Sequence, residues 1–173
     1  VARTYRFKKG SGMPISIPVI DMVEIGAGGG SLAHVDVMRQ IRVGPESAGS
    51  EPGPACYGRG GAKPAVTDAD LVLGKLDPDN FAGGTMKLDA ASSAKALTDV
   101  LGDVLEMDAT TSAFGMAEVV DENMANAARV HAVENGEDLS EYTMIAFGGA
   151  APLHAGRLCE KLGVDRLLVP QGA

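Results

Sequence analysis

The sequence contains no tryptophan and few other aromatic residues, with 3 tyrosines and 4 phenylalanines among 173 residues. A core with so few large rings must be built from Ala, Val, Leu, Ile and Met, which suits helices packed closely on a sheet. No apolar run approaches the roughly 20 residues that a bilayer span needs, and the first residues do not resemble a signal peptide. We therefore expect a cytoplasmic protein that does not enter a membrane.

The sequence also contains few basic residues and only two cysteines. There are 15 Lys and Arg against 23 Asp and Glu, which gives a net charge of −8. An acidic surface repels phosphate backbones, and no basic patch is concentrated anywhere, so we expect no nucleic-acid partner. The two cysteines, Cys56 and Cys159, are far apart and share no metal-ligand spacing. We expect both to be reduced thiols.

Glycine, by contrast, is abundant, with 23 residues, and it divides the N-terminal part of the chain. Residues 15–25 are rich in β-branched and apolar side chains and predict a strand. The glycines at 26–30 then turn the chain, and residues 31–43 partly alternate, which predicts either a returning strand or a hairpin. Residues 44–64 are so rich in Gly and Pro that we expect a long loop there.

The middle of the sequence is predicted to be helical. Thr67 or Asp68 caps a short helix, and Asp89 begins another that runs to about Val104. A helix of about 25 residues follows Asp108 and stops at Asn135-Gly136. Its small or apolar residues recur at steps of three and four, whereas its charged residues lie mostly off that stripe. The stripe comprises Ala113, Ala117, Val120, Met124, Ala127 and His131, and the charged set comprises Glu118, Asp121, Glu122 and Arg129.

The C-terminal part reads as strand 142–147, a Gly-Gly pair, helix 151–163 and strand 165–170. Short joins in this order predict a right-handed crossover between two parallel strands. With the N-terminal hairpin, the predicted class is α/β, a mixed sheet with packed helices. We interpret residues 1–173 as a single fragment of a larger protein, with a hairpin and Gly/Pro-rich loop at 1–66, a helical part at 67–140 and a β-α-β end at 141–173.

The first candidate site is the glycine cluster Gly26, Gly28, Gly29 and Gly30 with Ser31. Successive backbone N–H groups without Cβ atoms can converge on an anion, and the serine hydroxyl can add a donor. The alternative is a hairpin turn that needs positive φ angles. The spacing matches neither the P-loop nor the dinucleotide fingerprint, so these residues alone leave both readings open.

The second candidate site is Gly148 and Gly149, at the end of a predicted strand and immediately before a helix. Ligands of open α/β sheets bind beyond the carboxyl ends of strands, and a helix N-terminus adds a positive dipole. His154 lies in the first turns of that helix, where it could contact such a ligand. The alternative for the glycine pair is close packing at a strand–helix corner.

Three carboxylates, Asp21, Glu24 and Asp36, are expected to surround the first glycine cluster. Asp21 and Glu24 could hold Mg²⁺ through water, and Glu24 and Asp36 could orient a nucleophile in catalysis. Solvated carboxylates at a strand end are the alternative for each.

Several blocks of the sequence, taken in order, resemble one known family. They are "YRFKKGSG", "IDMVEIGAGGGSLAHVD", "VGPESAGSEPGPACYGRGG", "VTDADLVLGKLDP" and "MIAFGGAAPLHAGRLCEKLGV". Together they resemble the hydantoinase A/5-oxoprolinase family, specifically the C-terminal part of the hydantoinase A domain. That family includes ATP-dependent N-methylhydantoinase, 5-oxoprolinase and subunits of acetone and acetophenone carboxylases.

The resemblance implies one lobe of a fold related to actin, sugar kinases and heat-shock ATPases. It also implies ATP and Mg²⁺ as cofactors, with Gly26–Ser31 at the phosphates and Gly148-Gly149 beside the adenosine. The implied reaction is the activation of a cyclic amide by phosphoryl transfer before hydrolysis, an ATP-dependent hydrolase activity that the fragment alone is not expected to show. The implied partner is a hydantoinase B-like subunit or domain, with homo-oligomerisation left open. The alternative function is a non-catalytic assembly domain of a carboxylase or hydantoinase complex.

Overall fold

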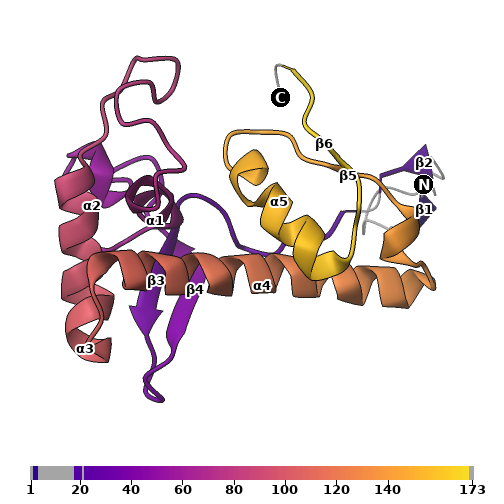
Figure 1. Ribbon diagram of the computed structural model, residues 1–173, viewed down its shortest axis with the longest axis horizontal. Helices are drawn as coiled ribbons and strands as arrows, with labels where there is room; N and C mark the ends of the chain where they lie inside the picture. Colours follow the sequence, from indigo (N-terminus) through magenta and orange to yellow (C-terminus); the bar gives the residue numbers. More distant parts are fainter. Residues whose placement is uncertain (1, 4–17, 21, 172–173) are drawn as a thin grey trace, which may run out of the picture.

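The computed structural model describes residues 2–3, 18–20 and 22–171, which form helices and three small two-stranded sheets (Figure 1). The strands are β1 (Ala2–Arg3), β2 (Pro18–Val19), β3 (Ser31–Val35), β4 (Ile41–Ser47), β5 (Met144–Ile145) and β6 (Leu167–Leu168). The helices are α1 (Val66–Val72), α2 (Ala90–Leu97), α3 (Asp103–Leu105), α4 (Ala109–Asn135) and α5 (Ala151–Leu162), with a π-helical turn at Thr98–Gly102 and 3₁₀ turns at Ala55–Tyr57 and Leu139–Glu141.

The long helix α4 runs along the length of the molecule (Figure 1). The side chain of Asp108 accepts a hydrogen bond from the Thr111 N–H at its start, and Gly136 ends it with a φ of 69°. The predicted start after Asp108 and the predicted stop at Asn135-Gly136 are therefore confirmed. Helices α1 and α2 and the β3–β4 hairpin lie towards one end of α4, and α5 with β5 and β6 lies towards the other.

The main core forms where α4 meets α1, α2 and the hairpin. Met116 and Val120 of α4 are fully buried there together with Leu97 and Leu101. The first half of the predicted apolar stripe, including Ala113, is buried, whereas its second half is only partly covered. This small-residue face allows close approach of the neighbouring helices, as the composition predicts.

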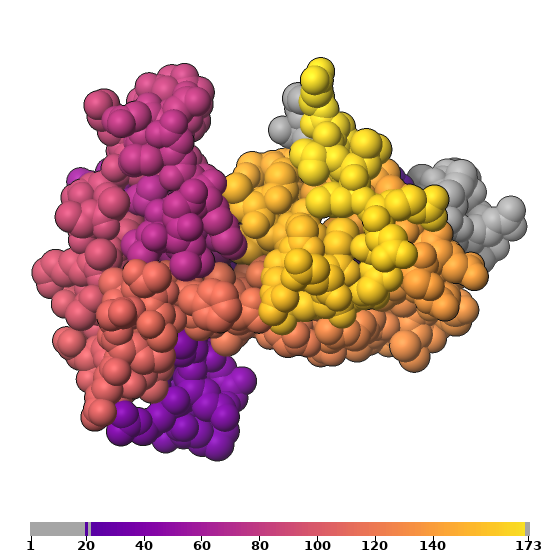
Figure 2. Space-filling view, viewed as in Figure 1, coloured from indigo at the N-terminus to yellow at the C-terminus, as the bar shows by residue number. Residues whose placement is uncertain are grey.

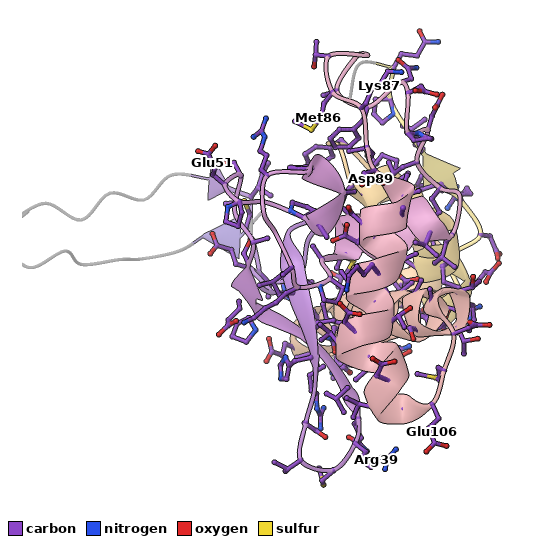
Figure 3. The ribbon with its side chains drawn as sticks, turned by 90° about the vertical axis from the view of Figure 1, so that its left-hand side faces the viewer. Arg39, Glu51, Met86, Lys87, Asp89 and Glu106 are labelled. Carbon is purple, nitrogen blue, oxygen red and sulfur yellow. The ribbon has the colours of Figure 1, made fainter. Side chains whose placement is uncertain are left out.

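Of the two predictions for residues 31–43, the hairpin is confirmed and the returning strand is wrong. Strand β3 pairs in antiparallel fashion with β4, not with residues 15–25. The turn between them is closed by Asp36, whose Oδ1 accepts hydrogen bonds from the N–H groups of Met38 and Gln40. An Asx-type turn of this kind supplies the reversal that we assigned to the glycines. Arg39, with a φ of 58°, lies at the tip of the hairpin (Figure 3).

Residues 22–25 belong to no strand, and residues 15–17 and 21 of the predicted first strand lie outside the described residues. At the other end of the hairpin, β4 continues through Gly44 and Pro45 to Ser47, so the predicted loop begins later than expected.

At the C-terminal end, β5 and β6 pair in parallel and α5 connects them, which confirms the predicted β-α-β unit. Figure 2 shows this segment lying over α4. The α/β class with both antiparallel and parallel pairing is confirmed, although the pairs form separate small sheets. None of the helices in the described part of the chain has the length and apolar character needed to cross a membrane.

Candidate functional site

The first glycine loop, Gly26–Ser31, is organised by its own serine. The Ser31 Oγ accepts a hydrogen bond from the Gly28 N–H at 3.0 Å and donates one to the Gly26 carbonyl at 3.3 Å. The Gly29 carbonyl accepts from both the N–H and the hydroxyl of Thr67, which fixes the loop to the start of α1. Within the described residues, no acceptor is bonded to the N–H groups of Gly29 and Gly30. Ser31 thus shapes the loop, and two backbone donors stay available.

The second glycine loop, Gly148–Gly149, leads directly into α5. Gly148 has a φ of 91°, a left-handed conformation that favours glycine. Pro152 stands in the first turn of α5, where its missing N–H costs no hydrogen bond. The positive end of the α5 dipole therefore lies beside this loop.

The two glycine loops line one cavity of about 250 Å³, which we call the glycine cavity. The first loop contributes Gly29 and Gly30, and the second contributes Gly149, followed by Ala150 and Leu153 of the α5 end. The other lining residues are Gly49, Pro54, Tyr57, Thr67, Asp70, Leu76 and Phe81. Segments that are about 120 positions apart in the sequence thus meet at one site, while the ligand-binding roles of Gly26, Gly28–Ser31 and Gly148–Gly149 stay predictions.

One wall of the glycine cavity is apolar and aromatic. The rings of Tyr57 and Phe81 lie 5.8 Å apart between centroids at a tilt of 47°. The Arg59 guanidinium lies 5.9 Å from the centroid of the Tyr57 ring, which is within cation–π range. A flat, partly apolar group could pack against this wall while an anionic group faces the glycine amides.

The Gly/Pro-rich loop that carries Tyr57 is held in place by Asp68, which is fully buried. Its Oδ2 accepts hydrogen bonds from the N–H groups of Ala55 and Ala65, at 3.0 and 2.8 Å. Its Oδ1 accepts from the Cys56 N–H and the Ser93 hydroxyl, at 2.8 and 2.6 Å. We predicted Asp68 only as a helix cap and missed this role, although a long loop implies many N–H groups that need acceptors.

His154 does not line the glycine cavity, so the prediction that it contacts the ligand is wrong for this geometry. Its ring is 1% exposed and lies between two buried carboxylates. Nδ1 is 2.7 Å from Asp121 Oδ1, and Nε2 is 3.3 Å from Asp70 Oδ2. Burial lowers the pKa of His154, but the hydrogen bonds and charges of Asp121 and Asp70 outweigh it and raise the pKa to about 9.

Asp121 was predicted to lie off the packed face of its helix, and this is also wrong, because it is only 2% exposed. Helix α4 is covered on two sides, by α1 and by α5, and Asp121 faces the second. Asp70 was not singled out from the sequence, yet among the residues that the structure describes it is the one charged side chain that lines the glycine cavity. The one sequence feature that could have drawn attention to Asp70 is its position two residues after Asp68.

The predicted catalytic and metal-binding carboxylates do not gather at the cavity. Asp36 lies beyond the far end of β3, where Arg42 pairs with it at 2.8 Å, so the expectation that it borders the glycine loop is wrong. Backbone N–H groups, first that of Gln40, and Arg42 lower its pKa. Glu24 is exposed and does not line the cavity, and Asp21 lies outside the described residues. In the part of the chain that the structure describes, no group of three or more His, Cys, Asp or Glu side chains could hold a metal ion.

Both cysteines are free and buried. Burial and the nearby Asp68 carboxylate raise the pKa of Cys56 to about 12, which keeps it a neutral thiol. Cys56 packs with Leu71 and Leu88 in a small second core beneath the aromatic wall.

Comparison with known proteins gives this geometry a family context. The model of the hydantoinase/oxoprolinase family matches residues 1–173. Caprolactamase subunit alpha of Pseudomonas jessenii is 38% identical over 159 residues, which are 92% of this chain and 23% of that protein. The acetophenone carboxylase gamma subunit of Aromatoleum aromaticum is 40% identical over 145 residues, which are 83% and 20% of the two chains. The chain therefore spans less than a quarter of the length of these relatives, both of which are subunits of larger complexes.

Solved structures agree with the sequence comparison. The crystal structure of ATP-dependent caprolactamase from P. jessenii superposes with a TM-score of 0.82 at 38% identity, over 91% of this chain and 23% of that one. A nucleotide-free structure of acetone carboxylase, which carries out ATP-dependent acetone carboxylation, superposes with a TM-score of 0.81 at 32% identity, over 91% of this chain and 22% of that one. By its sequence and its fold, the chain belongs to the hydantoinase/oxoprolinase family.

Proposed function

We propose that this chain forms part of the nucleotide site of an ATP-dependent enzyme that activates a cyclic amide by phosphoryl transfer and then hydrolyses it. The observation that carries the proposal is the meeting of Gly29, Gly30 and Gly149 in one cavity at the start of α5. Backbone N–H groups and a helix N-terminus are the donors that anionic phosphates favour. The relatives named ATP-dependent support ATP as the ligand.

The two glycine loops take different parts of the nucleotide in this proposal. The N–H groups of Gly29 and Gly30 face the phosphates, and Gly149 borders the adenosine near the aromatic wall of Tyr57 and Phe81. Phosphoryl transfer depends on positioning and charge neutralisation, so these groups bind and orient rather than react. When bound, Mg²⁺ would neutralise phosphate charge; Glu24, exposed on the segment before the first glycine loop, is the described candidate for holding it through water.

The whole protein requires a partner in this proposal. A hydantoinase B-like subunit or domain would complete the site and determine which cyclic amide is used, which agrees with relatives that are subunits of complexes. The reaction itself is tested by measuring substrate-dependent phosphate release from ATP by the full-length protein with its partner, using a hydantoin, 5-oxoproline and a lactam in turn. No stimulation by any cyclic amide would refute the amidase assignment.

The site is tested by filling the cavity at Gly149. A Cβ atom added at Gly149 meets no atom within 4 Å, so Gly149→Leu extends into the cavity without a clash at Cβ. Gly29 is a poorer choice because its Cβ would lie 2.9 Å from Thr67 Oγ1. Gly156→Leu is the matched control, since Gly156 is an exposed position of α5, the helix that follows Gly149, and is equally open.

We expect Gly149→Leu to weaken MgATP binding by the full-length protein at least ~10-fold, and Gly156→Leu to leave it unchanged. Isothermal titration calorimetry measures both affinities. If the Gly149→Leu variant and the unmodified protein bind MgATP with equal affinity, the nucleotide does not bind in the glycine cavity.

A further inference from the structure

Four charged side chains form a closed group behind the wall of the glycine cavity. His154 of α5 lies between Asp121 of α4 and Asp70 of α1, and all three are at least 98% buried. Lys75, just after α1, has its Nζ 3.0 Å from Asp70 Oδ1. Two carboxylates thus face two cations, and the group is neutral when His154 is protonated.

The geometry gives His154 the central place in this group. Its Nδ1–H donates to Asp121 at 2.7 Å, while the 3.3 Å contact of Nε2 with Asp70 is an ion pair without good hydrogen-bond alignment. A buried carboxylate left without its cation is strongly unfavourable, so both aspartates hold the ring between them. One imidazolium therefore ties together helices α1, α4 and α5.

Two of these three helices contribute residues to the lining of the cavity. Helix α1 contributes Thr67 and Asp70 itself, and the α5 end contributes Leu153, the residue before His154. Any shift of α5 relative to α1 would change the spacing between the second glycine loop and the first, because Thr67 also binds Gly29. The contact between His154 and Asp70 thus joins the two elements that carry the glycine loops.

We propose that His154 is a positioning residue of the glycine cavity, whose imidazolium, held between Asp70 and Asp121, keeps the two glycine loops at the spacing that binds the nucleotide. This inference rests on the proposed ATP site. In this inference His154 acts by holding other residues in place and does not contact the ligand.

The protonation of His154 depends on its two aspartates, because they are the charged groups that face its ring. From α1 the ring faces Asp70 with Lys75 behind it, and from α4 it faces Asp121. Beside this group, Arg157 of α5 pairs with Glu118 of α4, with Nε 2.8 Å from Oε1, so this ion pair does not involve His154. With the pKa of His154 raised to about 9 by the two carboxylates against the opposing effect of burial, the ring is protonated at neutral pH and loses its charge in alkaline solution.

The test measures MgATP affinity of the full-length protein by calorimetry between pH 7 and pH 10. We expect the affinity of the unmodified protein to fall as the pH passes about 9. We expect His154→Gln to bind at least ~10-fold more weakly at pH 7 and to lose this alkaline decline. His34→Gln, at an exposed histidine on β3, is the matched control and should behave as the unmodified protein.

A second variant separates positioning by the imidazolium from simple charge balance. Asp121→Asn combined with His154→Gln leaves Asp70 paired with Lys75 and restores neutrality, so the double variant should fold even if His154→Gln alone folds poorly. We expect it still to bind at least ~10-fold more weakly than the unmodified protein at pH 7 and to show no alkaline decline, because no imidazolium joins the helices. Recovery of the full affinity would show that only charge balance matters and would overturn the positioning role.

The outcomes distinguish this inference from the function on which it rests. Failure of the unmodified protein to bind MgATP at any pH would overturn both. Tight binding by the unmodified protein without an alkaline decline, or with the same decline in His154→Gln, would overturn the positioning role and leave the nucleotide site standing.

Discussion

Replacing Asp68 by asparagine should cost about 3 kcal/mol of unfolding free energy, because its carboxylate accepts four buried hydrogen bonds. An asparagine side chain has one acceptor oxygen and one donor amide in the same space. The oxygen can still accept the hydrogen bonds from the N–H groups of Ala55 and Ala65. The amide then points at the Cys56 N–H, which loses its acceptor, and at Ser93, whose hydroxyl can rotate to accept.

The magnitude follows from this count. One orphaned buried N–H costs about 1–3 kcal/mol, and the hydrogen bonds that remain lose their charge assistance, which is worth up to about 1 kcal/mol each. The sum is near 3 kcal/mol, a factor of more than ~100 in the unfolding equilibrium. Because Tyr57 and Pro54 of the tethered loop line the glycine cavity, ligand binding should weaken as well.

Urea unfolding followed by circular dichroism measures the effect, with Asp108→Asn as the control. Asp108 caps α4 from an exposed position, and asparagine caps helices about as well as aspartate, so the control should change the unfolding free energy by less than about 0.5 kcal/mol. If Asp68→Asn is as stable as the control, the carboxylate does not hold the loop, and the reasoning is refuted.

Two further predictions concern titratable groups. The pKa of His154 is raised in the folded state from 6.5 to about 9, so its contribution of about 3 kcal/mol is complete below pH 6.5 and is lost as the pH rises to about 9; the melting temperature should fall over that window, and His154→Gln should show no such fall. Burial raises the pKa of both Cys56, to about 12, and Cys159, so neither should react with a thiol reagent at pH 8 until urea unfolds the chain; stoichiometric labelling of the folded protein would contradict the structure.

The sequence predicted helix α4 well because its signals are local. Asp108 caps one end, Gly136 ends the other, and the small residues between them repeat at the helical period. The β-α-β end was predictable for a similar reason, since short joins leave few arrangements for the strands.

The hairpin and the buried charges could not be predicted in the same way. A cluster of glycines resembles a turn, but the chain reverses at Asp36, because one side chain that accepts two N–H groups makes a turn without glycine. Asp121 was grouped with the charged residues off the apolar stripe because its partner, His154, lies 33 residues further along the chain. Burial of a charge depends on such a partner, and periodicity within one helix carries no information about it.

The same charge pattern limits how the glycine cavity can bind a polyanion. Lys75 and His154 are the cations nearest to Asp70, and both are balanced by buried carboxylates, so neither offers free positive charge to a phosphate. The remaining attraction comes from backbone N–H groups and the α5 dipole, which together amount to a fraction of one charge, and from Arg59, whose guanidinium lies over the Tyr57 ring of the cavity wall. A triphosphate held there, as we propose, needs its own divalent cation or positive side chains from another part of the full protein. The glycine loops of this chain therefore determine where the phosphates lie, while most of the neutralising charge must come from elsewhere.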